Sequence, residues 1–344
     1  MKVVLFTLGG TIASTPAAGG VVPRLSGADL LTSVPGLDRA GLEVKVHDFR
    51  QVPSSSLTIG DILDLAVAIR EQVGAGADGV VVSQGTDTIE ETVFLLDLLY
   101  DGEAPVVFTG AMRHPMLAGA DGPANLLAAV TVAASPQARG LGCLVVFGDE
   151  IHAARFVRKA HTTSITAFIS PPTGPLGVVA EGRPVVLTRP VRRPALPALP
   201  AAGPPAGRPG GAAPARDIRT GLVTMVLGDD GTLLDAAAGR FDGLVVAGYG
   251  AGHVPEVLVT RLGDLAQRIP VVLASRTGAG MVLTRTYGYP GSELDLRDRG
   301  LIGAGFLDPI KARLLLHVLL VSGAARPQIA AAFAAIAADL ADPS

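Results

Sequence analysis

The sequence lacks three features that mark particular classes of protein. Its 344 residues contain a single cysteine, Cys143, which excludes an intrachain disulfide framework and a multi-cysteine metal site. It contains no run of about 18 or more apolar residues, so it predicts no membrane-spanning helix. Its 28 basic residues are outnumbered by 31 acidic ones, and the net charge of −3 excludes the electrostatic footprint of a protein that binds nucleic acid or an anionic membrane.

Lysine is also scarce. Only four of the 28 basic residues are lysines, namely Lys2, Lys45, Lys159 and Lys311, and the others are arginines. A chain that uses arginine for ordinary surface charge has some reason to keep a lysine, because an amine can lose its proton in a desolvated site and a guanidinium cannot. This is a weak signal by itself.

Apolar material, in contrast, is plentiful. The chain is 49% hydrophobic with a mean hydropathy of +0.45, which is enough for a sizeable core and excludes a disordered protein. At roughly 150 residues per domain, the length indicates two domains or one large α/β unit. The apolar start, residues 1–6, is shorter than the core of a secretory signal, so we expect a first strand there and a cytoplasmic protein.

In the first half, short β-branched runs alternate with helical patterns, which predicts βα units and a mostly parallel sheet. The predicted strands are 3–7, 42–49, 79–83, 105–109 and 143–147, the last with Cys143 buried in it. The predicted helices are 58–73, with Thr58 as N-cap, 89–99, with a capping box of Thr88 and Glu91, and 125–134.

The pattern changes between residues 190 and 216, where eight prolines stand among alanine, glycine and arginine. Prolines at this spacing forbid a helix, so we interpret the segment as an interdomain linker; a proline-rich recognition segment is the alternative. A second α/β pattern follows, with predicted strands 221–226, 243–247 and 270–274, a helix over 255–267, and two closing helices opened by Asp308-Pro309 and Pro327. The predicted fold is α/β: a larger N-terminal, mostly parallel domain (1–189), a Pro/Ala/Gly-rich linker (190–217) and a smaller C-terminal α/β domain (218–344).

Glycines and hydroxyl residues follow four of the predicted strands. They are Gly9, Gly10 and Thr11; Ser54, Ser55 and Ser56; Gly85, Thr86 and Asp87; and Gly110 with Ala111. In open parallel sheets, ligands bind beyond the carboxyl ends of the strands, so this concentration predicts a site there. Each residue alone has a structural interpretation, since Thr11, Thr86 and Asp87 are ordinary cap and turn residues. Neither the loop with Gly9, Gly10 and Thr11 nor the loop with Gly85, Thr86 and Asp87 has the spacing of a phosphate-binding or dinucleotide-binding loop.

Taken together, the motifs resemble those of the bacterial-type L-asparaginase family. The two specific motifs are GGTIA at 9–13 and QGTDTIEET at 84–92. Weaker ones follow in order over nearly the whole chain: TGAMR at 109–113, ADGP at 120–123, VRKAHT at 157–162, GPLG at 174–177 and DPIKAR at 308–313.

The resemblance implies hydrolysis of the side-chain amide of L-asparagine to aspartate and ammonia, with weaker glutaminase activity and without metal or cofactor. By similarity, Thr11 is the nucleophile and forms a β-aspartyl-threonine ester that water then cleaves. A threonine hydroxyl needs a neighbour that accepts its proton. In the family, a relay of a hydroxyl, an amine and a carboxylate serves this purpose, and the matching residues here are Thr86, Lys159 and Asp87.

The resemblance also implies how the substrate is bound. Ser54 and Ser55 would hold its α-carboxylate, Asp87 its α-ammonium, and the Ala111 carbonyl its amide. Backbone N–H groups of Thr11 and Thr86 are candidates for the oxyanion hole. A neighbouring chain's C-terminal domain completes family sites, and His253 stands where other members often have asparagine. We therefore expect a homodimer or homotetramer that acts on a small-molecule substrate.

Some positions depart from the commonest family pattern. Gln84 stands where many members have histidine, and the first loop, 14–23, has Val21 and Val22 where a catalytic tyrosine is usual. Tyr287 and Glu293 are candidates to replace that tyrosine and a glutamate from the partner subunit. Three histidines lack the spacing of metal ligands and are interpreted as structural or surface residues: His114, His152 and His161.

Two other functions stay open. One is an amino-acid-binding module with a weakened site, which the missing loop tyrosine suggests. The other is the ammonia-releasing subunit of a tRNA-dependent amidotransferase, which carries an extra domain before its first Gly-Gly-Thr motif. Because the motif begins at Gly9 here, we expect no such domain.

Overall fold

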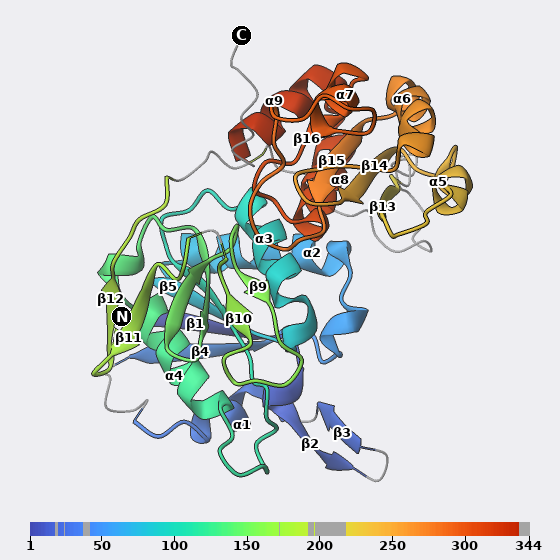
Figure 1. Cartoon of the computed structure of the whole chain (residues 1–344). Coiled ribbons are helices and arrows are strands. Elements are labelled where there is room, and N and C mark those ends of the chain that lie inside the picture. Colours follow the sequence, from blue (N-terminus) through green and yellow to red (C-terminus); the bar gives the residue numbers. More distant parts are fainter. Residues whose placement is uncertain are drawn as a thin grey trace, which may run out of the picture. The chain divides into compact units, whose positions relative to one another are not determined.

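Figure 1 shows the computed structural model of the chain, which describes residues 1–17, 20–23, 25–36, 42–171, 173–191, 196 and 218–336, with backbone alone at 15–17 and 20–23. The chain divides into two compact units, Met1–Leu196 and Pro197–Ser344. The predicted linker, 190–217, lies outside the described residues except at 190, 191 and 196. Each unit is α/β, as the sequence predicts.

The first unit begins with β1 (Lys2–Thr7), the 3₁₀ helix η1 (Thr11–Ala13), β2 (Ser14–Ala17), β3 (Gly20–Pro23), α1 (Gly27–Thr32), β4 (Glu43–Asp48), η3 (Ser54–Ser56) and α2 (Ile59–Gly74). It continues with β5 (Gly79–Ser83), η4 (Thr86–Thr88), α3 (Ile89–Leu99), β6 (Val106–Thr109), α4 (Gly122–Ala133), η5 (Pro136–Ala138) and β7 (Cys143–Phe147). It ends with β8 (Glu150–Ala153), β9 (Arg158–Lys159), β10 (Phe168–Ile169), β11 (Gly177–Ala180) and β12 (Arg183–Val186).

Within the described residues, eight strands of this unit form one sheet in the order β12-β11-β8-β7-β6-β5-β1-β4. Strands β4, β1, β5, β6 and β7 are parallel, and β8, β11 and β12 extend the sheet by antiparallel pairing. β5 and β7 match the predicted strands 79–83 and 143–147 residue for residue, and Cys143 is buried. The parallel register brings the carboxyl ends of β4, β1, β5 and β6 to one edge.

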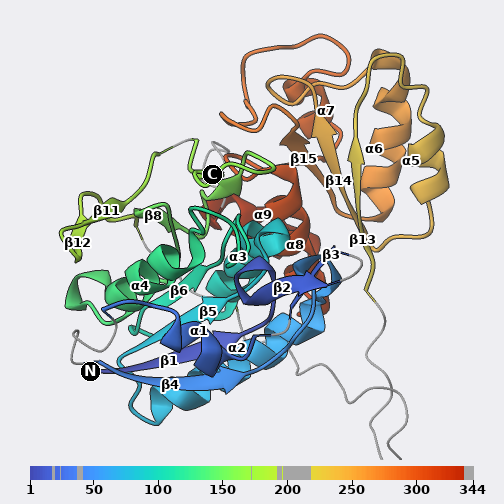
Figure 2. The same cartoon turned by 90° about the horizontal axis from the view of Figure 1, so that it is seen from below.

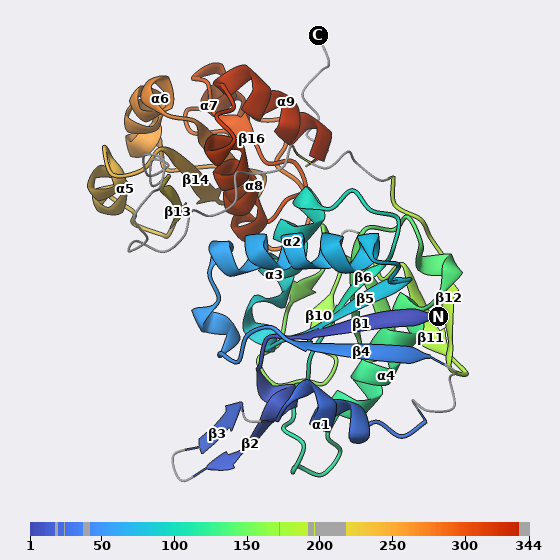
Figure 3. The ribbon, with the colours of Figure 1, turned by 180° about the vertical axis from the view of Figure 1, so that it is seen from behind.

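Helices cover both faces of this sheet (Figures 1 and 3). α1 and α4 pack on one face through a core that includes Leu30, Leu126 and Ala129 against Leu5 and Val81. α2 and α3 cover the other face. Burial on both sides explains why β5 is a continuous apolar run, as expected for a central parallel strand.

Two local predictions about this unit are wrong. The first loop, predicted over 14–23, contains β2 and β3, which pair as an antiparallel hairpin with Ser14 opposite Pro23. The predicted capping box at α3 is absent, because the Thr88 side chain makes no cap hydrogen bond. Its hydroxyl donates instead to the Ser54 carbonyl at 3.1 Å, so it ties two loops together. The N-cap prediction at Thr58 is confirmed, with Asp61 completing a capping box.

The second unit contains β13 (Thr220–Thr224), α5 (Thr232–Ala237), β14 (Gly243–Gly248), η6 (Glu256–Leu258), α6 (Val259–Arg268), β15 (Val271–Ser275), α7 (Glu293–Asp298), β16 (Ile302–Gly303), α8 (Pro309–Val321) and α9 (Arg326–Ile336). Its parallel sheet has the order β13-β14-β15-β16. α6 covers one face and α8 the other (Figure 2). Asp308 caps α8 by accepting from the backbone N–H groups of Ile310 and Lys311, and Pro309 is the first helical residue, as predicted.

Candidate active site

Four loops that follow β1, β4, β5 and β6 converge at the carboxyl edge of the N-terminal sheet. Glycine makes their close approach possible. Gly10 has φ 89° and ψ −175°, a backbone conformation that is essentially restricted to glycine, and a Cβ there would overlap the backbone nitrogen of Gly85. Since Thr11 follows Gly10 and Thr86 follows Gly85, this backbone contact brings the two motifs together.

The same packing joins the other two loops. A Cβ on Gly85 would lie 2.7 Å from the Ser54 hydroxyl oxygen, which places the Ser54 loop against the Thr86 loop. A Cβ on Gly110 would lie 2.6 Å from the Gln84 carbonyl oxygen. The four strand ends that the sequence selects therefore form one cluster of loops.

Lys159 lies within hydrogen-bonding distance of two predicted site residues. Its Nζ is 2.8 Å from Thr86 Oγ1 and 2.7 Å from Asp87 Oδ1. The Lys159 side chain is 14% exposed and Thr86 is buried, whereas the Asp87 side chain is 68% exposed. The arrangement is a hydroxyl, an amine and a carboxylate in sequence, with only the carboxylate open to solvent.

A short antiparallel pair fixes Lys159 in this position. In this pair, Phe168 of β10 stands opposite Lys159 of β9. The Phe168 ring is buried and packs on Phe147 of β7 with ring centroids 4.9 Å apart. The Ala160 N–H also donates to the Ala167 carbonyl at 2.7 Å. The amine is therefore carried on backbone that is anchored to the sheet.

The serine loop presents its two predicted residues differently. Ser54 is buried, and its carbonyl accepts from the Thr88 hydroxyl, whereas Ser55 is exposed. Gln84, at the position where a histidine is common, is buried beneath this region. Its amide donates to the Gly85 carbonyl and to Thr88 Oγ1, both at 3.3 Å, and its Oε1 accepts from the Thr92 hydroxyl at 2.9 Å. Gln84 thus supports the Thr86 loop through hydrogen bonds of its own.

Two side chains whose roles the sequence did not reveal hold the loop around Ala111. Asp121 accepts from the backbone N–H groups of Met112 and Arg113, both at 2.9 Å. Asn125 donates to the Gly110 carbonyl at 3.0 Å. The peptides on both sides of buried Ala111 are therefore fixed. The ADGP motif at 120–123 contained the signal for Asp121, since an aspartate before a helix often binds backbone N–H groups.

His253 lies in the C-terminal unit, in a cluster that also contains Tyr287, Tyr289 and Glu293. Its Nε2 is 3.2 Å from Glu293 Oε2 and its Nδ1 is 2.9 Å from the Tyr289 hydroxyl. Burial, followed by the charge of Glu293, raises the pKa of Tyr289. Because the pKa of Glu293 is lowered, its carboxylate can only accept, so Nε2 of His253 carries the proton that lies between them.

Glu293 is a poor candidate for direct contact with a substrate. It is fully buried, and its Oε1 accepts from the backbone N–H groups of Thr286 and Tyr287 at 2.9 and 2.8 Å. Burial raises the pKa of its carboxyl, but these hydrogen bonds and the one from His253 outweigh it, so the pKa is lowered and the group is ionised at neutral pH. Glu293 holds the loop and the histidine, while Tyr287 and Tyr289 remain exposed.

Two of the three histidines interpreted as structural or surface residues, His152 and His161, differ in surroundings. His152 is fully buried, and burial lowers its pKa from 6.5 to about 4; its Nδ1 is 3.0 Å from the Ser170 hydroxyl. His161 is exposed and accepts from two backbone N–H groups. Among the described residues, no group of three or more His, Cys, Asp or Glu side chains could hold a metal ion. Nor is any helix in the described ranges long and apolar enough to cross a membrane.

The fold and the loop cluster define an α/β protein whose candidate site combines threonine hydroxyls with a lysine amine. Residues 2–192 match the family model "Asparaginase, N-terminal", and residues 219–333 match "Glutaminase/Asparaginase C-terminal domain". The chain therefore belongs to the asparaginase family of enzymes.

Individual relatives agree with this assignment. A probable L-asparaginase of Deinococcus radiodurans is 40% identical over 96% of this chain and 97% of its own length. An L-asparaginase of Bacillus licheniformis is 35% identical over 93% of this chain and 96% of its own length. The crystal structure of a probable cytoplasmic L-asparaginase from Campylobacter jejuni has a TM-score of 0.81 at 28% identity, covering 96% of this chain and 98% of that one.

Proposed function

We propose that this chain hydrolyses L-asparagine to L-aspartate and ammonia through a β-aspartyl ester on Thr11. The observation that carries the proposal is Lys159 hydrogen-bonded to both Thr86 and Asp87, at a loop whose backbone meets that of the Thr11 loop. Membership of the asparaginase family and the names of the relatives support the substrate. The description of the C-terminal family model supports a glutaminase activity in addition, which we propose is the weaker one.

The chemistry needs an acceptor for the nucleophile's proton. The Thr11 oxygen attacks the amide carbon, its proton passes to the departing nitrogen, and the carbon–nitrogen bond breaks to release ammonia. The Thr86 hydroxyl can relay protons because it is small, buried and hydrogen-bonded to an amine. Water then cleaves the ester by the same route. Backbone N–H groups of Thr11 and Thr86 would stabilise the oxyanion.

Binding of the zwitterionic substrate follows from the charges at the loop cluster. The Asp87 side chain is largely exposed, and its carboxylate suits an α-ammonium group. Ser54 and Ser55 offer hydroxyl groups to the α-carboxylate, and the Ala111 carbonyl, on a loop fixed by Asp121 and Asn125, accepts from the side-chain amide.

We further propose that the active protein is a homo-oligomer in which a C-terminal unit contributes His253 to a site. Two exposed tyrosines beside His253 support an assembly role for this cluster, because such rings are enriched at interfaces. Like the relative from Campylobacter jejuni that is described as cytoplasmic, the protein would act in the cytoplasm. Sedimentation of a fully active monomer at assay concentration would contradict the oligomer.

Ammonia release from asparagine, glutamine and buffer alone tests the function. The Thr11→Ala variant should fold and still bind asparagine, but its turnover should be abolished, since the nucleophile is gone. Comparable kcat in this variant would remove Thr11 from that role. Binding of asparagine without release of ammonia by the wild type would instead indicate an amino-acid-binding module.

A further inference from the structure

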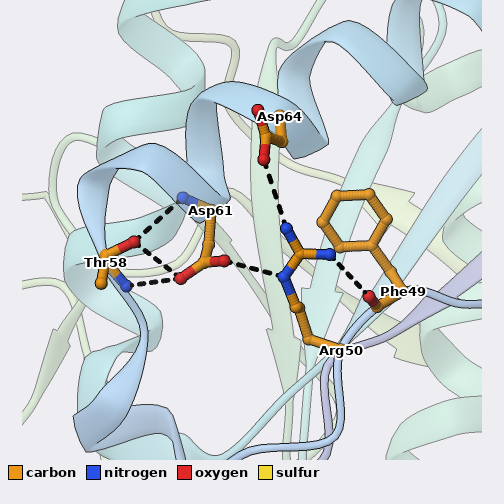
Figure 4. Close-up of polar contacts among 5 residues, drawn as sticks. All are labelled: Phe49, Arg50, Thr58, Asp61 and Asp64. Atoms are coloured by element: carbon orange, nitrogen blue, oxygen red, sulfur yellow. Dashed lines mark hydrogen bonds and ion pairs between the residues drawn. The ribbon is translucent and has the colours of Figure 1, made fainter. Parts of the chain in front are cut away.

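Arg50 lies just beyond β4 and contacts residues on both sides of the serine loop, residues 51–58 (Figure 4). Its Nε donates to Asp61 Oδ1 at 2.8 Å and its Nη2 to Asp64 Oδ2 at 3.2 Å, both in the first two turns of α2. Its Nη1 donates to the Phe49 carbonyl at 3.0 Å, and the guanidinium lies 4.6 Å from the centre of the Phe49 ring. One side chain thus joins the end of a strand to the start of a helix.

The start of the loop is fixed to the neighbouring strand as well. The backbone N–H groups of Phe49 and Arg50 both donate to the Thr7 carbonyl at 3.0 Å, and that of Val52 donates to the Leu8 carbonyl at 3.2 Å. This continues the pairing of β4 with β1 past the last strand residue. Since Thr11 follows β1, these hydrogen bonds hold the beginning of the serine loop against the strand that leads to the proposed nucleophile.

The far end of the loop depends on Asp61. One of its oxygens accepts from the Thr58 backbone and hydroxyl at 2.9 and 2.7 Å, and the other accepts from Arg50. Burial raises the pKa of Asp61, but the hydrogen bonds from Arg50 and Thr58 outweigh it and lower the pKa. The Asp61 side chain is 21% exposed, against 53% for Asp64, so the pair with Asp61 is the better shielded from solvent.

We propose that Arg50 is a positioning residue that orders the serine loop and thereby sets the affinity for the substrate's α-carboxylate. This rests on the proposed function, in which Ser54 and Ser55 bind that carboxylate. A planar guanidinium can hold two carboxylates and a carbonyl at once, whereas a lysine ammonium cannot reproduce that fork. The substrate's carboxylate is the same in the ground state and the transition state, so a disordered loop weakens both equally. The expected effect therefore falls on KM and not on kcat.

The test compares Arg50→Gln, Arg50→Lys and the control Arg70→Gln. Arg70 lies on α2, and its Nη2 donates to the Leu99 carbonyl at 2.7 Å, away from the loop. For Arg50→Gln, KM for asparagine and the inhibition constant of L-aspartate should rise about tenfold, and kcat should change less than about twofold. This is the result expected when the serine loop adopts its binding-competent conformation about a tenth of the time. Arg50→Lys should fall between Arg50→Gln and the wild type, and Arg70→Gln should leave KM unchanged.

Hydrogen exchange of the amides at 51–58 gives a readout that does not depend on activity. It should accelerate in Arg50→Gln and not in Arg70→Gln. Unchanged exchange, unchanged KM, or a fall in kcat at constant KM would each overturn the role of Arg50. A wild type that releases no ammonia from asparagine would overturn the proposed function, while the exchange comparison would still decide whether Arg50 orders the loop.

Discussion

Replacing Lys159 by arginine separates two roles that the geometry alone allows. As a base, the lysine must be able to lose a proton, and arginine stays protonated at any useful pH. As a counter-ion of Asp87, it needs only a positive charge, which arginine retains. The 2.7 and 2.8 Å contacts of its Nζ with Asp87 and Thr86 are compatible with both roles.

The magnitudes of the two roles differ enough to be told apart. Because the Asp87 side chain is 68% exposed, its ion pair with Lys159 resembles a surface pair, worth about 0–1 kcal/mol. Loss of that pair would cost less than about tenfold in rate. A positioned acid–base group is worth about 10²–10⁴ in kcat. We therefore expect Lys159→Arg to lose about 10²–10⁴ in kcat.

The assay is ammonia release from asparagine between about pH 6 and 10, with the melting temperature measured in parallel, since catalytic pKa values near the operating pH shape such profiles. Lys159→Met, which removes amine and charge together, should lose a similar factor while remaining folded, because an exposed Asp87 can be solvated. Near-wild-type turnover in a well-folded Lys159→Arg variant would refute the reasoning and reduce Lys159 to a counter-ion. Tyr287 would then be the first base to examine.

Two further predictions concern buried features. Between pH 6.5 and about 4, the unfolded chain takes up a proton at His152 that the folded protein does not. The free energy of unfolding should therefore fall by about 3 kcal/mol as the pH drops through this range. Denaturant unfolding of His152→Gln should show a shallower pH dependence, and equal slopes would exclude His152 as the cause. Gly10→Ala should lower kcat about 100-fold, because its Cβ meets the Gly85 backbone and displaces the Thr11 loop. It should also destabilise the fold by about 1–3 kcal/mol. Gly76→Ala, with φ 92° and open space, is the control for backbone strain alone, and equal losses of activity would argue against the loop contact.

The central parallel strands could be predicted from sequence because they are buried on both faces. Apolar β-branched runs such as 79–83 have no competing helical periodicity, and turns bound them on both sides. The antiparallel strands β8, β11 and β12 were missed. β12 is an edge strand in which exposed and half-buried residues alternate, so its sequence gives a weak signal.

Thr88 shows why the capping prediction failed. A threonine three residues before a glutamate is the pattern of a capping box, and nothing local contradicts it. The hydroxyl instead donates a hydrogen bond to the Ser54 carbonyl, a partner 34 residues away in the chain. Tertiary contacts thus override a local rule at the loop cluster, where the backbone groups of neighbouring loops compete for the same side chains.

The candidate site was only partly accessible to reasoning from residues. Strand ends at one edge of a parallel sheet predicted that the loops after β1, β4, β5 and β6 would meet, and the glycine contacts show how closely they do. Nothing in composition or spacing places Lys159 beside Thr86, 73 residues earlier; that pairing came from the family resemblance. Arg50 had no signal at all, since an arginine after a strand is ordinary until Asp61 and Asp64 are seen one turn apart on the helix that faces it. Motifs thus select the residues that we propose act on the substrate, whereas the role that we propose for Arg50 depends on contacts that only the folded chain reveals.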